Sequence, residues 1–137
     1  MRYYLAKSNP DVYKLREALD YYRSVTDVSW TICKDAKPSD ILFIGLSGEK
    51  AGIYAKAIVT GNPTFEELDD DFFINLKGAR KLAWVARLWG LVPMKHPILE
   101  HHLKAFPVLE RVAKWLHYQG KARHLSDEEG KALLRFI

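Results

Sequence analysis

Apolar residues alternate with polar or small residues along several short segments, which is the pattern of strands with one buried face. Residues 2–6 alternate in this way and predict a first strand, and residues 30–33 predict a second. The runs 41–44 and 53–59 flank a polar turn that contains Gly48. Two such runs around a short turn predict a buried β-hairpin.

A longer alternating segment, residues 80–92, predicts a strong strand that Pro93 is expected to end. Within this segment Trp84 alternates with Leu82 and Ala86. Side chains two positions apart share one face of a strand, so the pattern predicts that the Trp84 ring packs in the core.

Other segments have the apolar spacing of helices, with repeats every three or four residues. They are residues 11–23, 97–104, 106–118 and 127–136. Ser126 followed three residues later by Glu129 is a capping box, which predicts the start of the last helix. Residues 122–125, just before it, predict a short closing strand. The predicted order is a strand, a helix, several strands and then helices. This order favours a single α+β domain over residues 1–137, built on a small curved mixed sheet or barrel.

Between the hairpin and the long strand, residues 64–78 show neither period and are expected to form a long connection. Five of the six residues in 66–71 are acidic, and the segment carries Phe65, Phe72 and Phe73. Connections of this length inside a compact domain are usually functional or mobile. We therefore expect the phenylalanine rings to be packed down or to face a ligand.

Charge is unevenly distributed along the chain. The 21 Lys and Arg residues exceed the 17 Asp and Glu residues by four. Residues 77–124 contain ten Lys or Arg, two Glu and all five His. A basic half beside many aromatic rings is typical of proteins with a polyanionic partner, although a solvated surface gives the same composition.

No recognisable catalytic pattern is present. The chain has no phosphate-binding loop and no Gly-x-Ser-x-Gly element. Cys33 has no His near it in sequence, so we interpret it as a half-buried strand thiol. Adjacent His101 and His102 are expected to point apart, and neither a metal nor a cofactor is predicted. Asp69–Asp71 are interpreted as solvated acids. A binding module is therefore favoured over an enzyme.

Other features bear on location. A single cysteine permits no internal disulfide and suits a reducing compartment, so a cytoplasmic protein is expected. No apolar run reaches the length of a membrane span, and no signal-peptide pattern opens the chain, so no membrane partner is predicted.

Aromatic residues beside basic ones suit recognition of an unstacked nucleobase. Each base stacked on an aromatic ring contributes on the order of 1–3 kcal/mol. A methyl group on the base adds apolar surface and a weak positive charge that an aromatic cage attracts. A base inside a duplex would have to be flipped out to enter such a cage.

Several short stretches resemble the linked YTH and EVE families of the PUA-like superfamily. The shared stretches are Arg2–Asn9, Ser29–Thr31, Asp40–Ser47 and Gly52–Ala57. The run Lys7-Ser8-Asn9 and the Trp30-Thr31 pair look most like YTH domains. The pattern Lys7-Ser8-x-Pro10-Asp11 looks more like EVE domains, and so do residues 103–109 and 120–125. The resemblance covers nearly the whole chain.

This resemblance implies a PUA-like fold with flanking helices, no catalysis and a pocket for a modified base. YTH domains bind N6-methyladenine in an aromatic cage. EVE domains are associated with modified bases in DNA, including 5-methylcytosine, often as the specificity part of methylation-dependent restriction systems. Trp30 would be the first cage wall, with packing in the core as the alternative place for its ring, and the backbone of Thr31 would meet the exocyclic amine. Asn9, with the backbone of Lys7 and Ser8, would contact the base edge.

Further site residues follow from the same resemblance. Phe72 and Phe73 stand where YTH domains carry additional cage residues, and Tyr13 stands near the position of a second base-edge Asn. Ser47 is what remains of a Tyr-His-Ser element common in EVE domains. Trp84, although expected in the core, is the other aromatic candidate for the cage. The candidate phosphate contacts are Lys34, Arg80, Lys81 and Arg87.

We therefore predict a non-catalytic module that binds methylated RNA or DNA, single-stranded or base-flipped, with N6-methyladenine as the first hypothesis. The alternative ligand is 5-methylcytosine in duplex DNA. Two hypotheses of other classes stay open: an enzyme or metal protein that uses the His cluster, and a protein-interaction module that docks through the acidic, Phe-rich segment. An effector chain such as a nuclease or motor is a possible partner of the predicted module.

Overall fold

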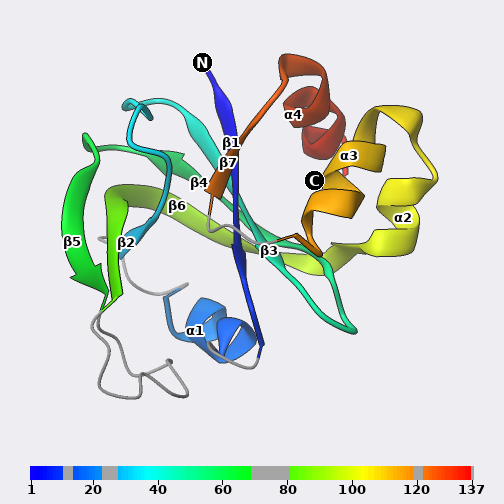
Figure 1. Ribbon diagram of the computed structural model, residues 1–137, viewed down its shortest axis with the longest axis horizontal. Coiled ribbons are helices and arrows are strands. Elements are labelled where there is room, and N and C mark those ends of the chain that lie inside the picture. Colours follow the sequence, from blue (N-terminus) through cyan, green and yellow to red (C-terminus); the bar gives the residue numbers. More distant parts are fainter. Residues whose placement is uncertain (11–13, 23–27, 69–80, 119–121, 137) are drawn as a thin grey trace.

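The computed structural model describes residues 1–10, 14–22, 28–68, 81–118 and 122–136. A curled sheet forms its centre, with helices on two sides (Figure 1). The strands are β1 (Tyr3–Ser8), β2 (Val28–Thr31), β3 (Ile41–Leu46), β4 (Gly52–Val59), β5 (Thr64–Leu68), β6 (Lys81–Leu99) and β7 (Ala122–Leu125). The helices are α1 (Leu15–Tyr22), α2 (Glu100–Lys104), the short 3-10 helix η1 (Pro107–Leu109), α3 (Glu110–Trp115) and α4 (Asp127–Leu134).

The strands pair in the order β2-β6-β4-β3-β1-β7, and β5 also pairs with β6. Among the described strands, only β1 and β3 run parallel, with Tyr3 opposite Ile41. The predicted hairpin is confirmed as the antiparallel pair β3 and β4, and the predicted closing strand is confirmed as β7. The α+β fold class predicted from the order of elements is also confirmed.

Strand β6 does not end at Pro93, contrary to the prediction, but continues to Leu99. Its pairing with β4 shifts twice, first opposite the stretch that contains Gly90 and again between Pro93 and Ile98. Gly90 has φ of 65°, the left-handed conformation that a glycine bulge requires. A strand tolerates proline at such irregular positions, because no regular ladder bond depends on the missing N–H.

The connection predicted over residues 64–78 begins with a strand, β5, which the sequence pattern did not reveal. Its ladder with β6 places Phe65 opposite Trp84, and the two rings lie 5.5 Å apart. Cross-strand aromatic pairs stabilise a sheet without requiring alternation along the chain. Trp84 is 38% exposed, so the prediction that its ring packs in the core is wrong. It lies near the start of β6, on the same face as Leu82, which is also exposed.

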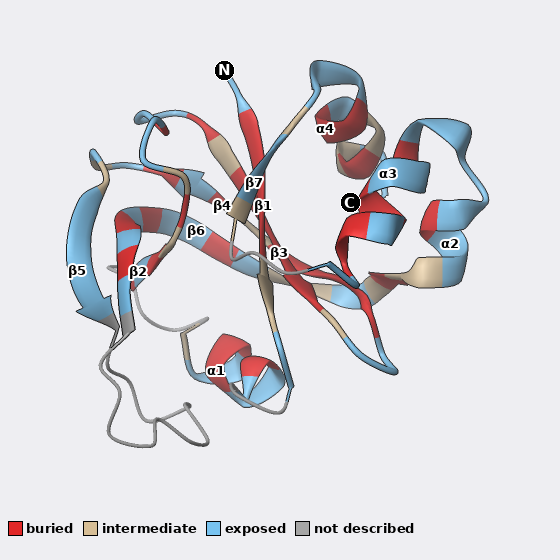
Figure 2. Ribbon diagram, in the orientation of Figure 1, coloured by how far each residue is buried: buried red, intermediate tan, exposed pale blue. Residues whose placement is uncertain are grey.

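Side chains of the sheet pack into two hydrophobic cores, one on each of its faces. Figure 2 shows that buried residues follow the central strands and recur in the helices. Along β1, Tyr4 belongs to the core that α1 covers, and Leu5 belongs to the core under α2, α3 and α4. This alternation explains why β1 is apolar on both faces. Trp115 is 2% exposed and anchors the second core.

The C-terminal helix is held by local and long-range contacts. The predicted capping box is present, because the Ser126 hydroxyl accepts from the Glu129 N–H and the Glu129 carboxylate accepts from the Ser126 N–H. A Cβ atom added to Gly130 would lie 2.1 Å from the Tyr3 ring. The helix can approach β1 this closely only because position 130 has no side chain.

Candidate nucleic-acid interface

The end of β1 and the turn after β3 lie together. The Ser8 carbonyl accepts a hydrogen bond from the Ser47 N–H at 2.9 Å and one from the Ser47 hydroxyl at 3.3 Å. The parallel pairing of the two strands creates this contact. Asn9 follows directly and is exposed, just ahead of α1. Three of the expected base-binding residues therefore occupy one end of the sheet.

Lys7 points toward the end of α3. Its ammonium group donates to the Trp115 carbonyl at 2.9 Å and lies 5.0 Å from the centre of the Trp115 ring. The Arg123 guanidinium lies 5.3 Å from the same ring. Burial lowers the pKa of Lys7, and the nearby charge of Arg123 lowers it further. The Lys7 side chain thus has a structural role, which leaves its backbone as the part suited to a base edge.

Trp30 is 8% exposed and belongs to the core beside α1. Its ring meets the Tyr22 ring edge-on, with centres 6.3 Å apart and planes at 85°. In the ladder of β2 with β6, Trp30 lies opposite Ala86, and half-buried Thr31 lies opposite Val85. Tyr22 was not among the predicted site residues, although its place at the end of the apolar face of α1 was a usable signal.

Several predicted residues lie outside the part of the chain that the structure describes. They are Tyr13, Phe72, Phe73 and Arg80. Lys81 is described only as the first residue of β6. Its proposed phosphate contact, like theirs, stays a prediction.

Two basic candidates can be placed. Lys34 is exposed in the connection between β2 and β3. Arg87 is exposed on β6, opposite Ser29, and its carbonyl accepts from the Thr60 N–H at 2.9 Å. Their positions are compatible with phosphate contacts, and their roles stay predictions.

The described residues also form an open pocket of about 550 Å³ that sequence reasoning missed. Its lining comes from α1, the turn after β3, β4, the end of β6 and α2, and includes Arg16, Tyr54 and His101. Burial raises the pKa of Tyr54, whose hydroxyl donates to the Lys50 carbonyl at 2.6 Å. The lining carries charges of both signs and does not include Trp30, so this pocket is separate from the predicted base site.

The histidines of α2 do not point apart, contrary to the prediction, since the His101 and His102 rings lie 4.0 Å apart. The Leu99 N–H donates to His102 Nδ1 at 3.2 Å, so this ring caps the helix. In the described part of the chain, the one set of three metal-ligating side chains that gathers within ligand distance lies elsewhere, at Cys33, Asp35 and His124.

No protein-family model matches the chain, and no curated protein sequence matches it. Solved structures do match over almost the full length. Protein PSPTO5229 from Pseudomonas syringae is 18% identical with a TM-score of 0.66, covering 98% of both chains. A hypothetical protein from Leishmania major is 15% identical with a TM-score of 0.68, covering 99% of this chain and 94% of that one.

Human THYN1, in complex with DNA that contains 5-methylcytosine, is also similar. It is 14% identical with a TM-score of 0.66, and the match covers 99% of this chain and 97% of that chain. At identities this low, the structural similarity establishes the fold alone. The chain has the PUA-like EVE fold, a curled half-barrel sheet with flanking helices. The fold expected from the resemblance to EVE and YTH domains is thereby confirmed.

Among the described helices, none is long and apolar enough to span a membrane.

Proposed function

We propose that this protein is a non-catalytic module that binds a methylated base in nucleic acid, with 5-methylcytosine in DNA as the ligand. The observation that carries the proposal is the near full-length similarity to THYN1, whose structure contains 5-methylcytosine DNA. The excess of basic residues over 77–124 supports a polyanionic partner. The ligand differs from the first hypothesis of the sequence analysis, because the structural similarity favours the cytosine alternative.

In this proposal the base enters beside α1, between the end of β1 and β2. Trp30 serves as the wall, and its packing against Tyr22 holds the ring in place before the ligand arrives. Asn9 and the backbone at Lys7 and Ser8 contact the base edge. Tyr13, Phe72 and Phe73 remain candidates for the rest of the pocket. Exposed Lys34 and Arg87 supply phosphate contacts that do not depend on the base.

N6-methyladenine is the second candidate ligand. The run Lys7-Ser8-Asn9 and the Trp30-Thr31 pair favour it, because they are the elements that most resemble YTH domains. Either ligand requires an extruded base, since a cage encloses the ring that a duplex keeps stacked. Because such a module has no catalytic groups of its own, its output would come from an effector such as the nuclease of a methylation-dependent restriction system.

Fluorescence anisotropy with matched oligonucleotides tests the proposal. The panel contains cytosine, 5-methylcytosine, adenine and N6-methyladenine in one sequence context, each as duplex DNA and as single strands of DNA and RNA. We expect methylation of cytosine to strengthen binding about tenfold, or about 1.4 kcal/mol. Equal affinity for methylated and unmethylated forms of both bases would contradict the proposal. Failure to bind any nucleic acid would also contradict the proposal and would favour a protein-interaction module instead.

A pair of conservative variants locates the site. Trp30→Phe keeps an aromatic ring in the core but shortens the proposed wall, so it should reduce the preference for the methylated base severalfold. The salt-dependent background should persist, because phosphate contacts supply it. Trp89→Phe is the matched control, since Trp89 is 59% exposed on β6 and should leave the preference unchanged. An unchanged preference in Trp30→Phe would exclude Trp30 as the wall.

A further inference from the structure

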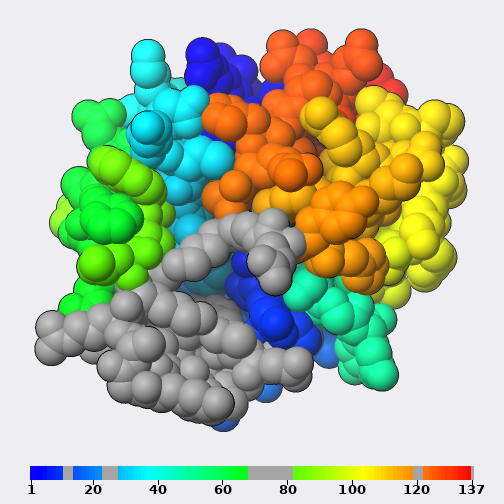
Figure 3. Space-filling model, in the orientation of Figure 1, coloured from blue at the N-terminus to red at the C-terminus, as the bar shows by residue number. Residues whose placement is uncertain are grey.

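The two edges of the open sheet approach each other at a seam. Strand β2 is one edge and β7 is the other. Cys33 and Asp35 follow β2 directly, and His124 lies on β7. On the face shown in Figure 3, the orange residues of β7 lie against the cyan residues of the β2–β3 connection. We call Cys33, Asp35 and His124 the seam cluster.

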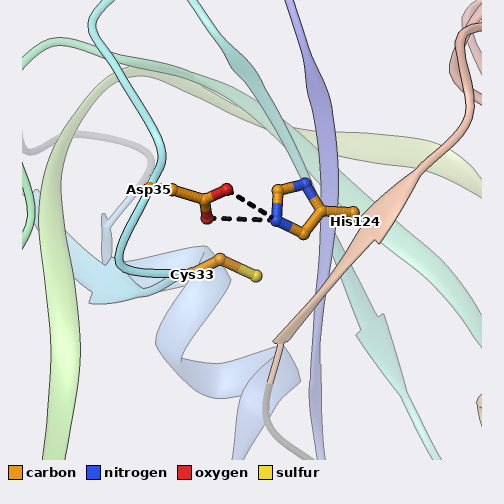
Figure 4. Close-up of side chains that lie close together, drawn as sticks. All are labelled: Cys33, Asp35 and His124. Carbon is orange, nitrogen blue, oxygen red and sulfur yellow. Dashed lines mark hydrogen bonds and ion pairs between the residues drawn. The ribbon is translucent and has the colours of Figure 1, made fainter.

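The ligand-capable atoms of the seam cluster all lie within 4.8 Å of one another. His124 Nε2 is 3.0 Å from each carboxylate oxygen of Asp35. Figure 4 shows the thiol, the carboxylate and the imidazole pointing toward one common space. The Tyr4 ring packs against the His124 ring at 4.7 Å and helps to hold it there.

We propose that the seam cluster is a binding site for a divalent transition-metal ion, with Zn²⁺ as the best match. A thiolate, an imidazole and a carboxylate are the three ligand types that Zn²⁺ prefers. Standard bond lengths in a tetrahedral site place ligand atoms about 3.3–3.6 Å from one another. Small side-chain rotations would bring the seam cluster to these separations, and the ion would take the place of the hydrogen bond between His124 and Asp35.

The alternative chemistry for these residue types is a Cys-His-Asp nucleophile. A nucleophilic cysteine needs a lowered pKa and a base that faces it. Here burial, with a further contribution from the Asp35 carboxylate, raises the pKa of Cys33 to about 11. His124 Nε2 is directed to Asp35. The arrangement disfavours a free reactive thiol, and a bound cation would have to offset the cost of ionising Cys33.

Such an ion would join the two sheet edges across the seam, linking residues 89 positions apart in sequence. Three protein ligands leave the fourth coordination position to water or another group, because the His124 and Asp35 side chains are about half exposed. Arg2 is a built-in competitor, since its guanidinium lies 3.5 Å from the Asp35 carboxylate. Removing that cation should strengthen metal binding.

The test uses the full chain without a polyhistidine tag, stripped of metal. Titration with Zn²⁺ against a competing chelator should give one ion per chain. Titration with Co²⁺ should give the near-ultraviolet charge-transfer absorption of a thiolate bound to the metal. Absence of one-to-one Zn²⁺ binding, or a Co²⁺ spectrum without the thiolate band, would overturn the proposal.

Variants assign the ligands. Loss of a residue that only hydrogen-bonds to a metal ligand typically lowers metal affinity about 10–100-fold. Cys33 and His124 are proposed as direct ligands, so Cys33→Ser and His124→Gln should each lower the affinity by about 100-fold or more. Arg2→Gln should raise the affinity severalfold. His96→Gln is the matched control, because His96 is exposed on β6 and outside the cluster.

Thermal unfolding provides an independent measurement. Zn²⁺ should raise the unfolding temperature of the wild type and of His96→Gln, because a ligand that binds only the folded state stabilises it. It should not raise that of Cys33→Ser. Metal-free melting curves establish that each variant folds. Equal Zn²⁺ affinity in Cys33→Ser and the wild type would overturn the assignment.

Discussion

The core under α2, α3 and α4, which we call the helical side, differs sharply from the seam. On the helical side, Trp115 is almost fully buried, and the buried carboxylate of Glu129 accepts two bonds from Arg111. At the seam, Asp35 and His124 are about half exposed, and none of the described helices covers them. The polar groups of the helical side are therefore buried and bonded to each other, which stabilises the fold. The polar groups of the seam are held in position but stay accessible to a ligand.

The largest expected effect comes from Gly130→Ala on the helical side. Alanine favours a helix over glycine by about 1 kcal/mol. The new methyl group would meet the Tyr3 ring at 2.1 Å, a distance that forces α4 away from β1. Overpacking typically costs about 1–3 kcal/mol, and a contact this short lies at the upper end of that range or beyond it, so it outweighs the helix preference. We expect a net loss of about 2 kcal/mol in the free energy of unfolding, measured with urea.

Lys131→Ala is the control for this prediction, because Lys131 is exposed in the same helix. It should change the free energy of unfolding by less than about 0.5 kcal/mol. Equal stability of Gly130→Ala and the wild type would show that the helical side is less tightly packed than its geometry indicates.

A smaller effect is expected from Arg111→Gln, which removes two bonds to the buried Glu129 carboxylate. Burial alone raises the pKa of Glu129, but the bonds from Arg111 and Ser126 outweigh it and leave that pKa lowered. A carboxyl with a lowered pKa stabilises the folded state above its ordinary value of 4.5, and this contribution is lost as pH falls below it. The variant should lose about 1–2 kcal/mol at pH 7.

The gap between Arg111→Gln and the wild type should narrow as the pH is lowered from 7 to 3.5, which urea unfolding at both values would measure. Lys114→Gln is the matched control on the same helix. Its partner Glu110 lies 3.5 Å away, and both side chains are about 60% exposed. Exposed pairs of this kind contribute about 0–1 kcal/mol, so this variant should be near neutral at both pH values.

The smallest effect is expected at the seam. Without metal, Cys33→Ser and His124→Gln should each change the free energy of unfolding by less than about 0.5 kcal/mol, because partly exposed side chains contribute little to packing. Thermal melts of the metal-free proteins would measure this. A loss as large as that of Gly130→Ala would mean that the seam is a structural core, and the contrast between the two regions would fail.

Local patterns predicted the elements that local physics governs. The capping box at Ser126 and Glu129 was visible because both halves of the contact lie within three residues. The hairpin was visible for the same reason, since a short turn joins its strands. Strand β5 was missed because it pairs with β6, a strand distant in sequence. Its residue Phe65 lies opposite Trp84, which is 19 positions further along the chain. The exposure of Trp84 was missed because alternation shows which residues share a face of a strand, but not which part of that face is covered.

The candidate base site was only partly accessible in this way. The contact of Ser8 with Ser47 follows from the parallel pairing of two strands, which no spacing along the chain reveals. The engagement of Lys7 with Trp115 joins residues 108 positions apart. The base-binding roles of Asn9 and Trp30 stay predictions that the oligonucleotide experiments would decide.

The class of fold, the hairpin, the capped C-terminal helix and the unequal distribution of charge could all be predicted from local patterns in the amino-acid sequence. These features depend on periodicity, turn residues and composition, which act over a few residues or over whole segments. Only the tertiary structure decided that Cys33 and His124 meet, that β6 passes through Pro93, and that Trp115 is buried. Such outcomes depend on which distant strands become neighbours when the sheet curls, and that is set by the packing of both cores together.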